Sequence, residues 1–128
     1  MKCLGVVFIR IKVKGYLKNI TDNEILEFEE KGIRNKDKIT YTNDKIKYTI
    51  KNDKSSIMLI REGSDFVNTF IFNMNNSTTN YLLKENNYSL DLDVVTLDMV
   101  IDDNFLIIKY KIIETENEYE FKAEMSEI

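Results

Sequence analysis

Histidine, proline and tryptophan are absent from this chain of 128 residues, and Cys3 is its one cysteine. Without histidine the chain cannot build a Ser-His-Asp triad, a Cys-His pair or a histidine-ligated metal site. One cysteine cannot form an internal disulfide or a thiolate zinc cluster, and the lack of disulfides fits a reducing cytoplasm. The sequence therefore predicts a cytoplasmic protein that has no metal, no cofactor and no catalytic residues.

Positive charge is also scarce, because 18 lysines and arginines face 22 acidic residues and the net charge is −4. In the densest basic stretch, residues 10–18, cations alternate with Ile11 and Val13, as on the wet face of a half-buried strand. Nucleic-acid binding needs a clustered basic surface, so we expect no nucleic-acid partner. Arg10 and Lys12 interrupt the first apolar run, and no run is long enough to span a membrane, so we expect neither a signal peptide nor a membrane segment.

Apolar and polar residues alternate through most of the chain, which is the period of half-buried antiparallel strands. Residues 7–14, 45–51, 88–93 and 118–125 show this alternation most clearly. Thr21 and Glu24 have the spacing of a helix capping box, but the alternation that follows them favours a strand. The phase of the alternation slips at Val94 and Val95, which predicts a β-bulge.

Tight turns separate these segments, and with four glycines and no proline the chain must build them from asparagine and aspartate. Residues 42–44, 51–54, 101–104 and 115–117 are such turns, and residues 73–80 form the most polar loop. About ten short strands joined in this way predict an up-and-down antiparallel meander, which must close or leave an exposed edge. We therefore expect one all-β domain, residues 1–128, closed into a barrel of about eight to ten strands.

The order of several landmarks resembles the YwiB-like bacterial domain, a small family with a calycin-type β-barrel and no settled activity. The resemblance covers roughly residues 6–125 and depends on "IKYTIKN", "IMLIREG" with Arg61 and Gly63, "FIF", Tyr81, Thr96, and "IIKYKI" with Tyr110 followed by "YEFKAEM". It implies a calycin- or lipocalin-like barrel and supplies no catalytic residues.

The chain departs from that family pattern at three places. Asn43 stands where an acidic residue is expected after the tyrosine of the third strand, and "KENN" stands where a glycine turn is expected after Tyr81. The tryptophan that lipocalins keep on their first strand is missing. The barrel fold therefore carries over more safely than lipocalin-like ligand binding does.

Arg61 ends an apolar strand and is the main candidate for a functional residue. If Ile57, Leu59 and Arg61 share one face, the guanidinium enters the barrel at its end, where it must be paired or reach water. We expect several hydrogen bonds, to a carboxylate or to the hydroxyls of tyrosines such as Tyr48 or Tyr110. The candidate ligand pocket is Arg61, Tyr48, Tyr110 and Tyr119, within a predicted inward-facing set that also includes Tyr41, Phe121 and Met125.

Other acidic clusters are better read as solvated surface. Asp91, Asp93 and Asp98 are close in sequence, and Asp102 and Asp103 follow, but the calcium-loop spacing is absent. A carboxylate pair of the glycosidase type stays open, because the separation of two carboxylates is a spatial fact.

Some strands are apolar on both faces, so part of their side chains must point outward and need a cover. These side chains are Met58, Ile60, Phe105, Ile107 and Ile113. Two functions follow. The first, which the sequence favours, is a filled, non-catalytic barrel that works through its surface, as a homodimer or as a protein-interaction module. The alternative is a barrel that binds a small ligand, in which Arg61 binds an anionic group of the ligand at the pocket mouth.

Overall fold

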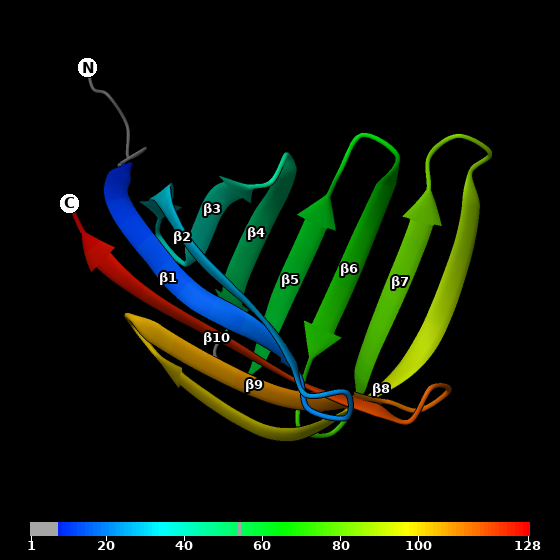
Figure 1. The fold of residues 1–128 in the computed structure, drawn as a ribbon. Helices are drawn as coiled ribbons and strands as arrows, with labels where there is room; N and C mark the ends of the chain where they lie inside the picture. The colour runs from blue at the N-terminus through cyan, green and yellow to red at the C-terminus, as the bar shows by residue number, and fades with distance from the viewer. Residues whose placement is uncertain (1–7, 54) are drawn as a thin grey trace.

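The computed structural model describes residues 8–53 and 55–128, and within them it contains ten β-strands and no helix (Figure 1). Three of the residues discussed above lie outside the described residues. They are Cys3, Val7 at the start of the alternation at 7–14, and Lys54 in the turn at 51–54. The strands are β1 (Ile9–Asn19), β2 (Glu24–Asn35), β3 (Lys38–Asn43), β4 (Ile46–Asp53), β5 (Ser56–Glu62), β6 (Phe66–Phe72), β7 (Ser77–Leu83), β8 (Tyr88–Asp102), β9 (Phe105–Ile112) and β10 (Asn117–Glu127).

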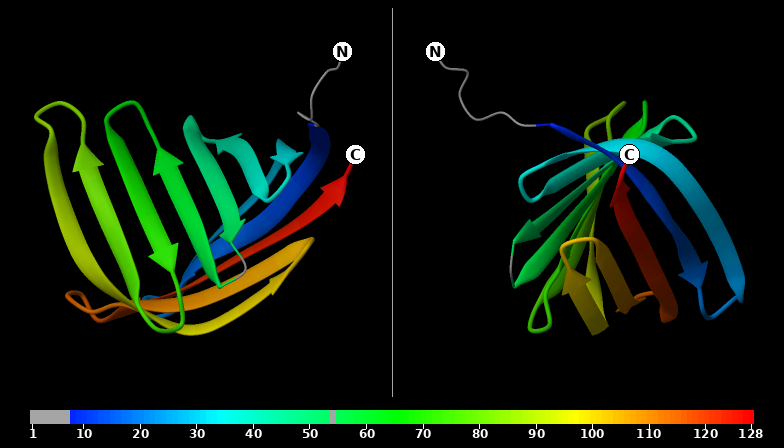
Figure 2. Two further views of the ribbon diagram at one scale, coloured as in Figure 1. Left: turned by 180° about the vertical axis from the view of Figure 1, so that it is seen from behind. Right: turned by 90° about the vertical axis from the view of Figure 1, so that its left-hand side faces the viewer.

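Each strand pairs antiparallel with the next along the chain, and β1 also pairs with β10, which closes the barrel. The predicted all-β meander is therefore confirmed, and its ten strands fit a calycin-like barrel. Figures 1 and 2 place β4 to β7 on one side of the barrel and β9, β10 and β1 on the other. Residues 21–32, which carry the capping-box pair, form a turn and most of β2, so the preference for a strand there is confirmed.

The core lies inside the barrel and consists of every second residue of most strands. Rings from opposite walls meet across it, because Phe70 and Phe72 of β6 lie 5.6 and 4.9 Å from Tyr110 of β9, measured between ring centres. The predicted inward-facing set is confirmed: Tyr41, Tyr110, Phe121 and Met125 are buried, and Tyr48 and Tyr119 pack against them. The side chains most completely buried are Phe72, Ile11, Ile50, Ile57, Ile108 and Val13.

The predicted bulge exists in β8, but its predicted position is wrong. Thr96 pairs with Tyr110 and Asp98 pairs with Lys109, so Leu97 is the extra residue. The apolar Val95 and Leu97 suggested an early slip because they face outward, whereas the polar Thr96 faces inward. Thr96 tolerates this burial because its hydroxyl shares a hydrogen bond of 2.7 Å with Ser77.

Asparagine and aspartate supply only part of the tight turns. Asn23, Asp44 and Asn87 adopt positive φ, as expected, but so do Lys36, Lys45 and Glu116. Asp44 and Lys45 both have positive φ between β3 and β4, which is the type I′ geometry that matches the twist of a two-residue hairpin. The chain thus uses charged residues in left-handed positions where glycine would be less strained.

Candidate ligand-binding site

One end of the barrel, which we call the mouth, is formed by the inner face near the β3–β4, β5–β6 and β7–β8 turns (Figure 1). Tyr81 lies opposite the buried Asn68, and Leu90 lies opposite Tyr81, so both side chains face the interior. These two inner-face residues are nevertheless accessible, because Tyr81 is 37% exposed and Leu90 is 44% exposed. The inner surface at the mouth is therefore apolar, partly aromatic and open to solvent.

Arg61 lies in this mouth. β5 alternates the buried Ile57 and Leu59 with Arg61 on the same face, so the prediction that Arg61 ends an inward-facing row is confirmed. Strand pairing places Tyr48 directly beside Arg61 on β4 and Asn68 directly beside it on β6. The guanidinium is half-buried between two neighbouring strands of one wall.

Two aromatic rings and one amide surround the guanidinium. Its central carbon lies 5.9 Å from the centre of the Tyr48 ring and 5.8 Å from that of Phe66. Its one hydrogen bond to the described part of the chain runs from Nη1 to Asn68 Oδ1, at 3.2 Å. Within the described residues no carboxylate forms an ion pair with Arg61.

The predicted partners of Arg61 are therefore wrong. We expected several hydrogen bonds to a carboxylate or to tyrosine hydroxyls, but Tyr48 offers its ring face and Tyr110 is not bonded to the guanidinium. The reason is the strand register. It places an asparagine amide directly opposite Arg61 on β6, and it places Tyr48 next to Arg61 on β4, so that the ring of Tyr48 and not its hydroxyl faces the guanidinium. A cation–π contact contributes about 0.5–1 kcal/mol at a partly exposed site.

Asn68 is held in place by a short chain of buried hydrogen bonds. Its Nδ2 donates to Thr79 Oγ1 and to the carbonyl of Asn80, each at 3.0 Å. Thr79 Oγ1 in turn donates to the carbonyl of Thr69 at 3.1 Å. These bonds fix the amide so that Oδ1 points to Arg61. The sequence reasoning missed Asn68, although a polar residue at an inward position of "FVNTFIF" was the available signal.

Tyr41 and Tyr110 carry protonated hydroxyls close to this cation. Burial raises the pKa of both hydroxyls well above the usual range, and the positive charge of Arg61 partly opposes this rise. The hydroxyl of Tyr41 is buried and has no hydrogen-bond partner among the described residues. The carboxylate of Glu30 further raises the pKa of Tyr41. The interior beside Arg61 thus contains neutral rings and one unsatisfied hydroxyl.

The four predicted pocket residues form two pairs rather than one cluster. Arg61 and Tyr48 are in contact, whereas Tyr110 and Tyr119 stack on each other at 5.3 Å on the facing wall. Tyr110 packs against Phe70 and Phe72, so it belongs to the filling of the barrel beneath the mouth. The candidate site is therefore the Arg61 pair together with Phe66, Asn68 and the open apolar surface beside them.

Gly63 has a local role beside this site. A Cβ atom on Gly63 would lie 2.6 Å from Cε1 of Phe66, so the missing side chain leaves room for the ring that lies against Arg61. The amide of Gly63 donates to the carbonyl of Phe66 at 3.1 Å, and this bond closes the turn predicted after Arg61.

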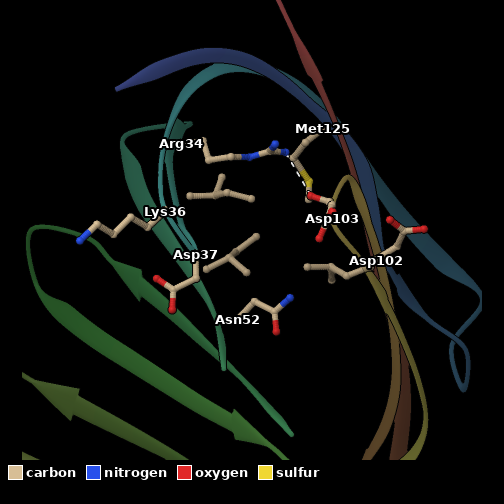
Figure 3. Close-up of a pocket in the computed structure, with 10 residues that line it drawn as sticks. Arg34, Lys36, Asp37, Asn52, Asp102, Asp103 and Met125 are labelled. Atoms are coloured by element: carbon tan, nitrogen blue, oxygen red, sulfur yellow. Dashed lines mark hydrogen bonds between the residues drawn. The ribbon is translucent and has the colours of Figure 1, made fainter. Parts of the chain in front are cut away.

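A second hollow lies at the opposite end of the barrel (Figure 3). Its volume is about 300 Å³, and Asp37 and Asn52 lie across it from Asp103. Arg34 reaches over the barrel end and donates to the carbonyl of Asp103 at 3.2 Å and to Asn104 Oδ1 at 3.0 Å. Because Arg34 is already bonded to the β8–β9 turn, it ties two hairpins together. This hollow was not predicted from the sequence, and its other lining residues are Lys36, Ile39, Ile50, Asp102, Leu106 and Met125.

The acidic side chains give no ion-binding geometry. Asp91, Asp93, Asp98, Asp102 and Asp103 are all exposed on strand faces and a turn. In the described ranges, no three histidine, cysteine, aspartate or glutamate side chains gather closely enough to hold a metal ion.

Residues 8–53 and 55–128 contain no helix of the length and apolarity that crossing a membrane requires.

The fold is similar to that of a solved bacterial protein. The crystal structure of the ywiB protein from Bacillus subtilis matches 94% of this chain and 92% of its own, with a TM-score of 0.67 and 16% sequence identity. The fold implied by the YwiB-like resemblance is therefore confirmed. No protein-family model matches the chain. No curated protein matches it by sequence either.

Proposed function

We propose that this protein is a non-catalytic, cytoplasmic barrel that binds a small amphipathic anion at its mouth. The observation that carries the proposal is the half-buried guanidinium of Arg61, which has one hydrogen-bond acceptor in the described chain. An arginine side chain keeps its charge at every physiological pH and offers several N–H donors. A carboxylate, sulfonate or phosphate group at the mouth would accept the remaining donors in short, charge-assisted bonds.

The surface around Arg61 suits the apolar part of such a ligand. Phe66 and Tyr81 stack at 5.4 Å beside the guanidinium and present aromatic surface to the mouth. Leu90 and Tyr88 continue this surface on β8 and are exposed. Because Phe70, Phe72 and Tyr110 fill the barrel below, we expect a short or flat ligand and not a long chain that threads the interior.

The same filled interior is compatible with the function that the sequence favoured, a barrel that acts only through its outer surface. The two accounts differ in what they require of Arg61. The surface account needs only the contacts of Arg61 with its neighbours, because the remaining donors of a half-buried guanidinium can reach water, whereas the ligand account requires an anion to replace that water. The single bond to Asn68 favours the ligand account.

Native mass spectrometry of the protein purified from its own host tests the proposal. We expect a mass excess that corresponds to one small molecule and disappears on denaturation. Arg61→Gln should lose this excess, and Arg34→Gln at the other barrel end should keep it. A bare mass in the unmodified protein, or equal retention by both variants, would count against a ligand at the mouth.

A homodimer is the second candidate function, and the outer face of β5 to β7 favours it. Met58 lies beside Ile71, and Val67 lies beside Leu82, all on the outer wall. Ile60 lies between these pairs, and Ile71 is exposed. A second copy of the chain would cover this apolar face.

The outward-facing side chains of β9 and of the residue after it give a weaker argument for dimerisation. Phe105 is half-exposed, and the ammonium group of Lys122 lies 5.6 Å from the centre of its ring. Ile113 is exposed beyond the end of β9. Sedimentation at high micromolar concentration tests the dimer: Ile71→Lys should give monomers, whereas Val100→Lys on β8 should not. A monomeric mass for the unmodified protein would contradict self-association.

A further inference from the structure

The second strand has a free edge over most of its length. β2 pairs with β1 from Arg34 to Glu24 without interruption, but it pairs with β3 only from Gly32 to Asn35. Over residues 24–31, therefore, one edge of β2 has no partner strand in the described part of the chain. Figure 1 shows β2 continuing beside β1 well beyond the short β3, and Figure 2 shows the same extension from the side.

This edge carries charged side chains, which help to protect an edge strand, but it lacks the backbone devices that prevent strand pairing. Proteins blunt such edges with bulges, prolines or short strands. Here the register with β1 is continuous, and the chain has no proline. Apolar side chains also lie exposed along the edge, namely Ile25 and Leu26. A hollow of about 290 Å³ lies next to them, lined by Leu17, Asn19, Glu24, Ile25, Leu26 and Tyr119.

The charge of the segment is one-sided. Residues 24–31 contain four glutamates and one cation, Lys31. Glu29 pairs with Lys12 of β1 at 3.5 Å, and Glu27 forms no ion pair within the described residues. The free edge is therefore an acidic strand with unpaired backbone groups.

The strand on the other side of β2 shows which sequence pairs well with it. In β1, Lys12 and Lys14 lie on the outer face, opposite Lys31 and Glu29, while Ile11 and Val13 face the interior. On this paired edge both lysines meet the same carboxylate, because Lys14 lies opposite Glu29 and Lys12 reaches Glu29 diagonally at 3.5 Å, although Lys12 itself lies opposite Lys31. The same alternation would match its free edge, where Glu27 and Glu29 face outward and Leu26 and Phe28 face inward.

We propose that residues 24–31 of β2 bind an extended segment of another protein by strand addition, and that this segment alternates basic and apolar residues. Main-chain hydrogen bonds to the free edge would supply affinity, and alternate side chains would supply specificity. Lysine or arginine would lie opposite Glu27 and Glu29, and the apolar side chains would cover Leu26 and enter the hollow beside Tyr119.

A second copy of this chain does not fit the same edge. Two β2 strands paired antiparallel would bring the glutamates of residues 24–30 against each other, and like charges on facing strands are destabilising. The binding partner is therefore a different protein with the complementary charge. This inference does not depend on ligand binding by Arg61, because the Arg61 guanidinium contacts residues of β4 and β6.

Synthetic peptides test the proposal. The probe is a fluorescein-labelled peptide KVKVKVKV, compared with EVEVEVEV and with KKKKVVVV, which has the same composition without alternation. We expect saturable binding of KVKVKVKV by fluorescence polarisation, and hydrogen-exchange protection of backbone amides within residues 24–31. The double variant Glu27→Lys/Glu29→Lys should weaken this binding about tenfold, because two favourable cross-strand pairs become repulsive.

The matched control is Glu85→Lys/Glu127→Lys, which makes the same change of net charge at exposed positions away from this edge. This control and Arg61→Gln should bind KVKVKVKV like the unmodified protein. The proposal is wrong if KKKKVVVV binds equally well, if the control loses the same affinity, if protection appears elsewhere, or if no peptide binds. Protection of residues 24–31 by dimerisation, without peptide, would assign the edge to a second copy instead.

Discussion

Arg61 and Asn68 face each other across the β5–β6 hairpin, and the 3.2 Å bond between them is the one hydrogen bond of the guanidinium to the described chain. Asn68 is buried and donates both bonds of its amide group elsewhere, so its Oδ1 depends on Arg61 as a donor. The relationship is asymmetric: Asn68 is satisfied by Arg61, but Arg61 retains donors for a further partner.

This asymmetry predicts the effect of Arg61→Met on stability. The change removes contacts with two aromatic rings and leaves the buried Asn68 Oδ1 without a donor. We expect the free energy of unfolding to fall by about 1–3 kcal/mol. Urea unfolding measures this, with the exposed Arg10→Met as the control, which should change stability by less than about 0.5 kcal/mol. An Arg61→Met protein as stable as the control would show that the bond to Asn68 contributes nothing.

Tyr41→Phe should have the opposite effect. The Tyr41 hydroxyl is buried without a partner, and an unsatisfied buried polar group costs about 1–3 kcal/mol. Removing it while keeping the ring preserves the stacking on Tyr48 at 4.9 Å and on Phe28 at 5.4 Å. We therefore expect Tyr41→Phe to raise the thermal unfolding temperature. A lower temperature would show that this hydroxyl has a partner in solution.

Stability should decrease in alkaline solution because of the buried tyrosines. Burial raises the pKa of Tyr41 and Tyr110 far above its usual value, whereas the unfolded chain loses these protons near pH ~10. Above that pH the folded state binds more protons than the unfolded state. The stabilisation is therefore complete below about pH 10 and declines above it, by about 1.4 kcal/mol per pH unit for each tyrosine.

Tyr16 should contribute in a narrower range on the outer wall. Its hydrogen bond to Glu120, together with partial burial, raises its pKa to about 12. Its contribution is therefore lost between about pH 10 and its folded pKa.

Urea unfolding between about pH 9 and pH 11 tests the role of the buried tyrosines. The free energy of unfolding should decline less steeply with pH for Tyr110→Phe than for the unmodified protein. Equal declines would contradict the assignment of Tyr110 as a buried, protonated group.

Two glycines should respond differently to alanine. A Cβ on Gly15 would lie 1.8 Å from the carbonyl oxygen of Lys122, which belongs to the β10 backbone. A Cβ on Gly63 would meet only the ring of Phe66, which can turn away from Arg61. We expect Gly15→Ala to destabilise the barrel by about 3 kcal/mol or more and Gly63→Ala by about 1 kcal/mol. Equal thermal unfolding temperatures for the two variants would show that β10 can move to accept the extra atom.

The fold could be predicted because its signal is local. Alternation along each strand states which side chains face inward, and Ile57, Leu59 and Arg61 follow it without exception. The predicted position of the bulge was wrong because Val95 and Leu97 are apolar although they face outward, so in the sequence they look like inward-facing residues. Only the strand pairing distinguishes the two faces.

The partners of Arg61 could not be predicted from the sequence, because they depend on register. A shift of one residue between β5 and β6 would replace Asn68 by Val67 or Thr69, and nothing local in the sequence fixes that pairing. The free edge of β2 is hidden for a similar reason. It exists because β3 is short, and which residues of β2 remain unpaired is decided by the pairing of Gly32 with Tyr41.

Paired fluorescent probes test the central claim, an anion site at Arg61, most directly. Anilinonaphthalene sulfonate is an amphipathic anion, and N-phenylnaphthylamine is its neutral analogue. We predict that Arg61→Gln weakens binding of the anionic probe by a factor of about ten or more, as the loss of a charge-assisted hydrogen bond requires, and leaves the neutral probe unchanged. Arg34→Gln should bind both probes like the unmodified protein. Equal binding of the anionic probe by the unmodified protein and Arg61→Gln, or equal loss of both probes, would contradict the account.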